Sequence, residues 1–499
     1  MSIQRDKGSL SVFSAISFML IAQFLFVVLE ASRYEEMKKV TEIQSRAQVE
    51  SLFAEYCIPL WEQYHLLACD LDTDYIRVML NESAEKYAFL NEGTILSSNS
   101  NFVRAILEDV DISNLELITD EDGQIFEAEV SSYMKNNITY EAARRIYDRY
   151  NSLGDLTESS DYEEASIDDA LDVINNPENY QNEETTQSCI IQQTSSDSGS
   201  GTGTSNSGET LSDVRNIQQT GILALVLDSN VEVSDKSIED TNVVSKRTLS
   251  SGTNVARPQN GWYDKILMEQ YIESYMSSFR NPNSDRALEY EIEYIVCGKS
   301  SDEANLKSVV NKILAIREAA NYVYILSDAA KMAEVTALAA SIGGATLNPA
   351  AILLIKAGLI AAWAYCESIL DVRALLQGDK IPIIKSSNTW TSGLSGISTL
   401  LSGNAKAISS EQGISYQNYL GFLLMAQSTS KSAYRTMDMQ EKTINCIEGY
   451  ENVKMDKMFC KLGVNMDYNY SCIFAGMVNL VSNNLGMIKI RQNAKYAYF

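Results

Sequence analysis

The sequence predicts an α+β protein with an N-terminal transmembrane helix that continues into a helical stalk. An extracytoplasmic body of long helices packed on a small, mostly antiparallel sheet should follow. Three observations predict this class. Residues 9–29 form a run without a charged side chain. Long stretches after it repeat apolar residues at three- and four-residue steps, which is typical of helices. A few short runs alternate apolar and polar residues, which is typical of strands.

The charge-free run at residues 9–29 is long enough to span a bilayer, whose core is ~30 Å thick. It exceeds the ~7–15 apolar residues of a secretory signal peptide, which favours an uncleaved anchor over a cleaved signal or a buried core helix. Arg5 and Lys7 precede the run and Arg33 follows it, so the positive-inside rule does not decide the orientation. The short head and the large acidic remainder favour a cytoplasmic head and an extracytoplasmic body.

A stalk is predicted after the membrane run, because no Pro or Gly interrupts the chain there. Its apolar stripe can pack on the protein's own body, which we expect, or on a partner helix. The stripe consists of Met37, Val40, Ile43, Ala47, Val49, Leu52 and Phe53.

The stretch from residue 151 to 210 is acidic, contains no Lys or Arg, and ends in a Ser/Gly-rich tract. Such a composition is typical of a disordered linker or insertion, and its acidic spacing does not match an EF-hand loop. The expected organisation is a head and transmembrane helix at 1–30, a stalk at 31–70, the first part of the body at 71–150, the linker at 151–210 and the main body at 211–499.

Strands are predicted from short alternating or apolar runs. Asp122-Gly123 indicates a hairpin turn. In Leu288–Val296, the glutamates Glu289, Glu291 and Glu293 should face solvent. The predicted strands are 114–119 and 124–130 around the turn, 221–228, 288–296, and two closing strands at 472–480 and 487–499 around a loop at 482–486.

Helices are predicted at 75–110, 131–150, 262–279, 303–341, 349–376 and 416–446. The helix from Pro349 to Leu376 is apolar, but Lys356 interrupts it. We therefore expect 303–376 to form a buried helical hairpin that covers the strand at 288–296, and not a second membrane span.

Composition excludes several classes of function. The 499-residue chain carries a formal net charge of −26, which disfavours nucleic-acid binding. Its eight cysteines include no Cys-x-x-Cys pair and its one histidine is His65, so no metal site is expected. Disulfides and buried thiols both fit the even count, and we expect buried thiols. No phosphate loop or dinucleotide glycine pattern occurs, so no cofactor is expected.

Glu367 and Asp371 form the core of a predicted polar cluster, because a spacing of four places them on one helix face. Arg373, Arg435 and Asp438 are its other candidate members. Paired carboxylates can perform acid–base chemistry, which would suit a surface hydrolase. We expect instead a structural ion-pair network between packed helices, and we assign no catalytic residue.

Several segments together resemble an uncharacterised family of membrane-anchored bacterial envelope proteins encoded beside tight-adherence (Tad-type) pilus and secretion genes. The start of the membrane run also resembles Tad pilin-like proteins, which have Gly-Ser followed by Glu at the fifth mature position. This chain has Gly8-Ser9, but Phe13 stands at that position. The segments that carry the family resemblance are 7–13, 52–64, 293–298, 363–376, 381–390, 416–420 and 434–438.

The resemblance implies a single-pass protein of the bacterial cell membrane. We expect a non-enzymatic cell-surface protein, a pilin-like or assembly component of a Tad-type pilus or secretion system, with a surface hydrolase as the alternative. Its expected partners are the membrane, through residues 9–29, and other pilus or secretion components, through the stalk.

Overall fold

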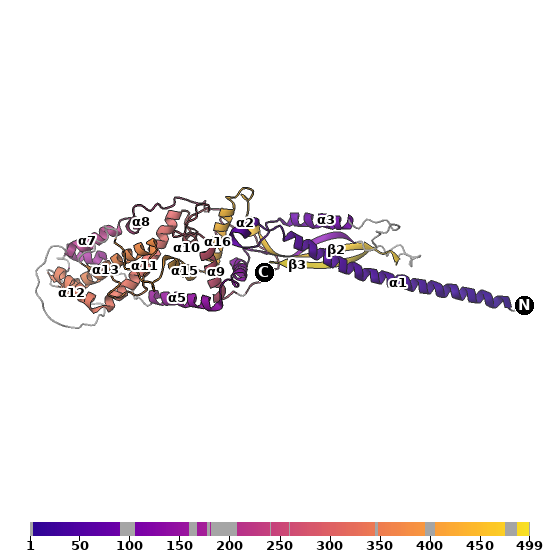
Figure 1. Cartoon of the computed structure of the whole chain (residues 1–499), viewed down its shortest axis with the longest axis horizontal. Coiled ribbons are helices and arrows are strands. Elements are labelled where there is room, and N and C mark those ends of the chain that lie inside the picture. Colours follow the sequence, from indigo (N-terminus) through magenta and orange to yellow (C-terminus); the bar gives the residue numbers. More distant parts are fainter. Residues whose placement is uncertain are drawn as a thin grey trace. The chain divides into compact units, whose positions relative to one another are not determined.

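Two units, each assembled from segments far apart in sequence, make up the chain. Unit 1 contains Met1–Tyr133, Val244–Asn260 and Ile444–Phe499, and unit 2 contains Met134–Val243 and Gly261–Thr443. The elements are labelled in Figure 1. The computed structural model describes residues 3–89, 105–158, 167–176, 180, 207–239, 241–258, 260–344, 348–394, 405–474 and 487–498.

Unit 1 is built on an antiparallel sheet in the order β1-β2-β3. The strands are β1 (Ile106–Leu117), β2 (Phe459–Ser471) and β3 (Met487–Ala497). The predicted strand at 114–119 lies largely in β1, and the last predicted strand is confirmed as β3. The central strand β2 was not predicted. Residues 472–474, where we expected another strand, follow the end of β2, and residues 475–486 lie outside the described part.

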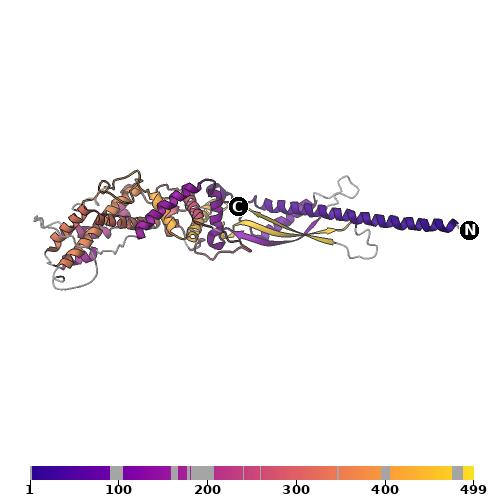
Figure 2. The same cartoon turned by 90° about the horizontal axis from the view of Figure 1, so that it is seen from below.

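One face of this sheet is covered by α1 (Ile3–Leu52) and α3 (Thr73–Phe89). Figure 2 shows α1 running lengthwise along the strands. Met37, Val49 and Leu52 of α1 enter the same core as Met466 and Tyr468 of β2. The prediction that the stalk packs on the protein's own body is therefore confirmed.

The buried face of the stalk differs in part from the predicted stripe. Thr41 and Ser45 point inward, where Thr41 Oγ1 accepts a hydrogen bond from Gln492 (2.9 Å) and Ser45 Oγ lies 3.0 Å from the Tyr468 hydroxyl. Val40 and Ile43 are exposed. Hydrogen bonds to the sheet thus allow polar residues to occupy positions that hydrophobicity alone would assign to the surface.

Three predicted strands are wrong, because the chain there is helical. The second arm of the predicted hairpin is α4 (Gln124–Met134), reached through η1 (Glu121–Gly123). The other two are α8 (Ile222–Val226) and α10 (Glu291–Cys297). Every residue from Tyr290 to Val296 is buried, the glutamates included. The alternation of apolar and polar residues predicted a strand with one face in solvent, but this segment is buried on all sides. A short run of this kind fits both the two-residue period of a strand and the 3.6-residue period of a helix.

Unit 2 is helical and centred on α13 (Pro349–Gln377), which confirms the predicted helix there. It packs against α11 (Asp302–Ser327) and α12 (Ala329–Gly343). We predicted α11 and α12 as one helix, but Asp328 ends the first and caps the second by accepting from Ala330 N (2.9 Å) and Lys331 N (3.2 Å). The segment that this hairpin was expected to cover is the helix α10 and not a strand, but α11 does pack against it, so the predicted contact is confirmed.

Three of the predicted helices are divided or cut short. The predicted helix at 416–446 breaks at residues 427–428, and the one at 131–150 breaks after Met134. Of the predicted helix at 75–110, residues 75–89 lie in α3 and residues 106–110 lie in β1, whereas residues 90–104 are outside the described part. The other helices are α5 (Tyr140–Glu158), α7 (Ser207–Gln218), α9 (Trp262–Tyr275), α15 (Tyr416–Ala426) and α16 (Thr429–Ile444); α2 (Ile58–Tyr64) and η5 (Met455–Lys457) belong to unit 1.

Part of the acidic stretch at 151–210 is folded. It contributes α6 (Ile167–Asn175), whose Ile167, Ala170 and Val173 are buried. Gly358 of α13 allows this approach, because a Cβ there would lie 2.4 Å from the Ala170 Cβ. Residues 181–206, with the Ser/Gly-rich tract, lie outside the described part.

Candidate functional site

The site is built on α13, which holds Glu367 and Asp371 one turn apart on one face. Asn348 caps the start of this helix by accepting from Ala350 N (2.9 Å), and Pro349 occupies its first turn. Gly378 ends the helix in the left-handed conformation, with φ of 98°. Both carboxylates are fully buried in unit 2. The prediction that they share a face is confirmed.

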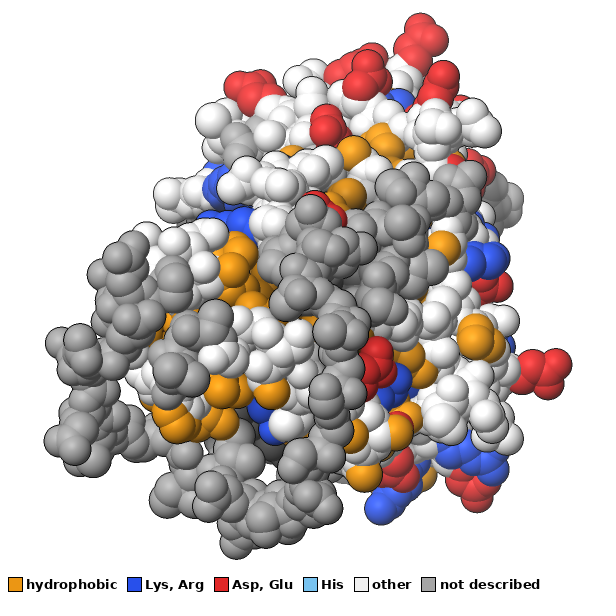
Figure 3. Space-filling model, turned by 90° about the vertical axis from the view of Figure 1, so that its left-hand side faces the viewer, with side chains coloured by type: hydrophobic (Ala, Val, Ile, Leu, Met, Phe, Trp, Pro, Cys, Tyr) orange, Lys and Arg blue, Asp and Glu red, His pale blue; other side chains and the backbone are white. Residues whose placement is uncertain are grey.

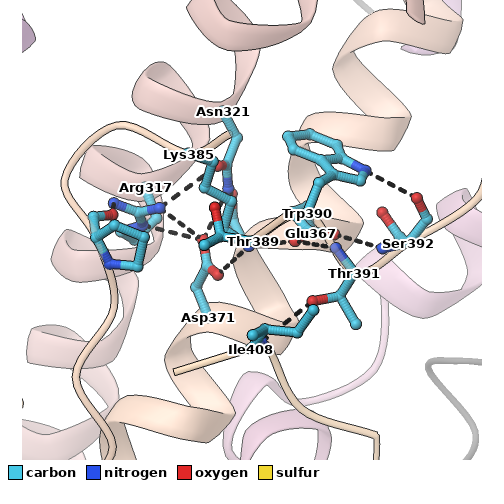
Figure 4. Close-up of polar contacts among 12 residues, drawn as sticks. Arg317, Asn321, Glu367, Asp371, Lys385, Thr389, Trp390, Thr391, Ser392 and Ile408 are labelled. Atoms are coloured by element: carbon cyan, nitrogen blue, oxygen red, sulfur yellow. Dashed lines mark hydrogen bonds and ion pairs between the residues drawn. The ribbon is translucent and has the colours of Figure 1, made fainter. Parts of the chain in front are cut away.

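Asp371 lies between two cations (Figure 4). Arg317 of α11 approaches its Oδ2 through Nε at 3.0 Å and Nη2 at 2.9 Å, and Lys385 Nζ lies 2.6 Å from Oδ1. Asn321 Nδ2 donates to the same Oδ2 at 2.9 Å and to the Ser368 hydroxyl at 2.9 Å. Two helices and the loop after α13 are therefore joined at one carboxylate.

Glu367 also binds Lys385, and it accepts two backbone hydrogen bonds (Figure 4). Thr391 N donates to Oε1 at 3.0 Å and Ser392 N donates to Oε2 at 2.8 Å. Trp363 Nε1 donates to the Ser392 hydroxyl at 2.9 Å. These contacts fix the course of the loop from residue 385 to 392 over α13.

The charges of this network balance, since Arg317 and Lys385 face Glu367 and Asp371. A general acid or base must reach a substrate proton, but both carboxylates have no exposed surface. The Lys385 ammonium occupies the position between them that a bound cation would need. Within the described part of the chain, no group of three or more His, Cys, Asp or Glu side chains could hold a metal ion. This network of ion pairs and hydrogen bonds therefore suits a structural role, in which it holds α11, α13 and the following loop together.

The other three candidates lie elsewhere. Arg373 Nε donates to Leu225 O at 2.6 Å and its Nη1 donates to Ala405 O at 3.0 Å, and burial lowers the pKa of this guanidinium. Arg435 Nη1 donates to Ile295 O at 3.0 Å, and Asp438 accepts from the Tyr294 hydroxyl at 2.9 Å. The contacts described here do not join all five residues into the predicted cluster: Arg435 and Asp438 contact Ile295 and Tyr294 of α10 instead of Glu367 or Asp371.

Arg317, Asn321 and Lys385 are members of the network that the sequence analysis missed. A signal for the first two exists, because the buried stripe Val310, Ile313 and Leu314 of α11 continues into Arg317 and Asn321 at helical spacing. A polar residue on an apolar stripe indicates a buried partner. Lys385 comes from a loop, and no local pattern predicts its contacts.

A second pair of buried acids, Glu291 and Glu293, lies on α10 itself. Glu293 Oε1 accepts from Phe279 N at 2.9 Å and from the Tyr416 hydroxyl at 2.8 Å. Glu291 Oε2 accepts from Ser277 N at 2.9 Å. Burial raises the pKa of Glu293 to about 7. Backbone N–H groups and the Tyr416 hydroxyl donate hydrogen bonds to these carboxyl groups, so the two glutamates also stabilise the packing of unit 2.

Four of the cysteines are buried as free thiols. Cys57, Cys69, Cys366 and Cys460 are buried thiols. Burial raises the pKa of Cys69 to about 11, which keeps this sulfur protonated and unreactive at neutral pH. For these four residues the expected buried thiols are present.

A comparison with known families gives one match. The profile of DUF5702, a family of unknown function, matches residues 200–470. No curated protein and no solved structure matches the chain. The matched region includes the α13 network, whereas α1 and β3 lie outside it.

Proposed function

Because the chain belongs to the DUF5702 family, whose function is unknown, we propose a function from its own architecture. We propose a non-enzymatic, membrane-anchored cell-surface protein, a pilin-like or assembly component of a Tad-type pilus or secretion system. One observation carries the proposal. In the 50-residue helix α1, the run Leu10–Leu29 is apolar and largely exposed, and the part that follows it is packed on the sheet of unit 1.

The exposed run Leu10–Leu29 of α1 needs an apolar environment. Its large side chains are exposed around the helix, and Phe18 reaches 73%. Leaving apolar surface in water costs ~25 cal/mol per Å², and a bilayer removes that cost over the whole run. The members of this run that are each more than half exposed include Leu10, Phe13, Phe18, Leu20, Phe24 and Leu25.

The continuity of α1 supports a mechanical role. The helix passes from the apolar run into the stalk without a break, and the stalk shares a core with β2 and β3. Movement or tension on the anchor is therefore transmitted to the sheet of unit 1. A component of a surface fibre or of its assembly platform needs such a rigid connection.

The Tad-type assignment and the orientation rest on the sequence. The resemblance to envelope proteins of Tad loci supports the first, and the large acidic remainder that follows the apolar run supports the second. The alternative hydrolase would need a carboxyl that reaches solvent, and the closed, neutralised pair Glu367 and Asp371 gives it no support. We therefore propose no second function.

The anchor is tested with two matched double variants of the full chain, expressed in a bacterial host. Ile21→Arg/Leu25→Arg places two charges in the apolar run, at ~2.5–3.5 kcal/mol each. Val40→Arg/Ile43→Arg places two charges on exposed stalk positions. We expect only the first variant to leave the membrane pellet after carbonate extraction. If both variants stay in the pellet as the unchanged chain does, the anchor proposal fails.

The assembly role is tested by deleting the gene in a host that makes Tad-type fibres. We expect electron microscopy to show loss of surface fibres, restored by the full chain and by Val40→Arg/Ile43→Arg, but not by Ile21→Arg/Leu25→Arg. Unchanged fibres in the deletion strain would contradict an assembly role and leave the anchor standing.

A further inference from the structure

The end of β2 is fastened to α1 at the point where the apolar run ends. Arg33 Nη1 donates to Glu30 Oε1 and to Ser471 O, both at 2.9 Å. Glu30 Oε2 accepts from the backbone N–H groups of Ile473 (3.2 Å) and Phe474 (2.7 Å). Glu30 and Arg33 are both less than a tenth exposed. We call these contacts between Glu30, Arg33 and residues 471–474 the clasp.

Aromatic rings surround the clasp on both sides. Arg33 lies over the Tyr470 ring, 5.4 Å from its centroid, and Tyr34 lies 6.2 Å from the same ring. On the other side, Phe474 stacks on Phe26 at 6.2 Å with an interplanar angle of 15°. Phe26 precedes Glu30 by one turn, which is ~6 Å along the axis. Phe474 therefore lies beside the apolar run, on the membrane side of Glu30.

The position of the bilayer boundary follows from the length of the run. At ~1.5 Å per residue, Leu10–Leu29 matches a hydrocarbon core ~30 Å thick. Glu30 then marks its outer edge, because a shift in either direction would bury the ion pair in lipid or expose apolar side chains to water. Tyr34 and Tyr470 fall at the headgroup level, where aromatic residues with a polar end are enriched.

We propose that Ile473 and Phe474, which follow the end of β2 and are called the tip below, form a second membrane contact, inserted at the boundary between lipid headgroups and acyl chains next to α1. This inference rests on the proposed membrane anchoring. The clasp satisfies the backbone N–H groups of both residues, which removes the cost of taking unpaired donors into a lipid environment. Two contacts at one bilayer surface fix the rotation of α1 and hold the sheet of unit 1 at a set distance from the lipid.

The test uses tryptophan emission from the full chain in vesicles of phosphatidylcholine whose acyl chains carry bromine near the glycerol end. Phe474→Trp and Ile473→Trp report on the tip, and Phe24→Trp reports on the run. Tyr496→Trp is the distant control, since Tyr496 pairs with Leu462 whereas Ser471 pairs with Met487, nine residues or ~30 Å further along the sheet. The emission of the four native tryptophans is subtracted with the unchanged chain.

We expect bromine to quench the added emission of Phe474→Trp and Phe24→Trp and to leave Tyr496→Trp unchanged. Quenching of Phe24→Trp without quenching at 473 or 474 overturns the membrane contact of the tip and leaves the anchor intact. Equal quenching at 474 and 496 also overturns it, because the whole sheet would then lie on the bilayer. An unquenched Phe24→Trp refutes the proposed anchoring, and the inference fails with it.

Discussion

The buried carboxylate of Asp371 forms ion pairs with two cations from different segments, Arg317 and Lys385. Removing one partner of a buried ion pair leaves an uncompensated charge in a medium that solvates it poorly. The Asp371 network therefore makes the packing of α11, α13 and the following loop interdependent. Its two cations, Arg317 and Lys385, lie 54 and 14 positions from Asp371 in the sequence, so no local sequence pattern predicts that they pair with this carboxylate.

Asp371→Asn should destabilise unit 2 by about 3–5 kcal/mol, the cost typical of breaking a buried pair. The midpoint of chemical unfolding measures this change. Arg46→Ala is the control, since the Arg46–Glu50 pair is exposed and such pairs contribute at most ~1 kcal/mol. Equal shifts in the two variants would contradict a structural role for the Asp371 network.

Three buried glutamates should make the protein more stable in mild acid. Burial raises the pKa of Glu129 to about 8 and the pKa values of Glu269 and Glu293 to about 7. The folded state thus holds protons that the unfolded state has released above its pKa of ~4.3. Their contribution is fully present below that value and is lost as pH rises through 7–8.

We therefore expect the melting temperature to fall between pH 5 and pH 8. In Glu293→Gln, which keeps a neutral hydrogen-bonding side chain, this fall should be smaller. A melting temperature that rises over the same range, or an unchanged slope in the variant, would refute the assignment.

At the level of elements, long helices were predicted better than short ones. The helix at 349–376 was predicted almost to the residue, because Asn348, Pro349 and Gly378 mark its ends and its apolar content is high. The helix α10 was mistaken for a strand, since alternation over seven residues fits a buried helix equally well. Capping residues therefore gave more reliable information here than the period of a short run.

The first turns of α13 offer a matched pair of substitutions. Ile355 is 1% exposed and Leu353 is 54% exposed. Ile355→Asp should unfold unit 2, because it buries an unpaired charge, whereas Leu353→Asp should leave its melting temperature within a few degrees. Circular dichroism on heating distinguishes them, and similar unfolding in both would show that the start of α13 is buried on all sides. Apolar side chains also reach the surface on the face shown in Figure 3.

At the level of the whole molecule, the sequence predicted the long apolar N-terminal helix, the continuous stalk and a mixed class of helices with a small antiparallel sheet. It did not predict which strands pair. β1 and β2 come from opposite ends of the chain, and single-sequence patterns carry no information on such distant partners. The same holds for the polar network, whose carboxylates were found but whose cations were not.

The two units should unfold as separate transitions. Ending the chain after residue 486 removes β3 and with it Ile490 and Ala494 from the core of unit 1. Calorimetry should then show loss or lowering of one transition and an unchanged second one. Asp371→Asn should move only that second transition. Coincident shifts of both transitions in either variant would indicate one cooperative unit.

The pairing of β1 with β2 also has a consequence for biosynthesis. Leu117 pairs with Phe459, so the ribosome must add 459 − 117 = 342 residues before this partner exists. At ~5–20 residues per second, β1 waits about 17–70 s as an unpaired strand. Exposed strand edges invite aggregation, and charged side chains oppose it. Glu108, Asp109 and Asp111 are exposed on β1 even in the finished sheet, and during translation they would keep the waiting strand soluble.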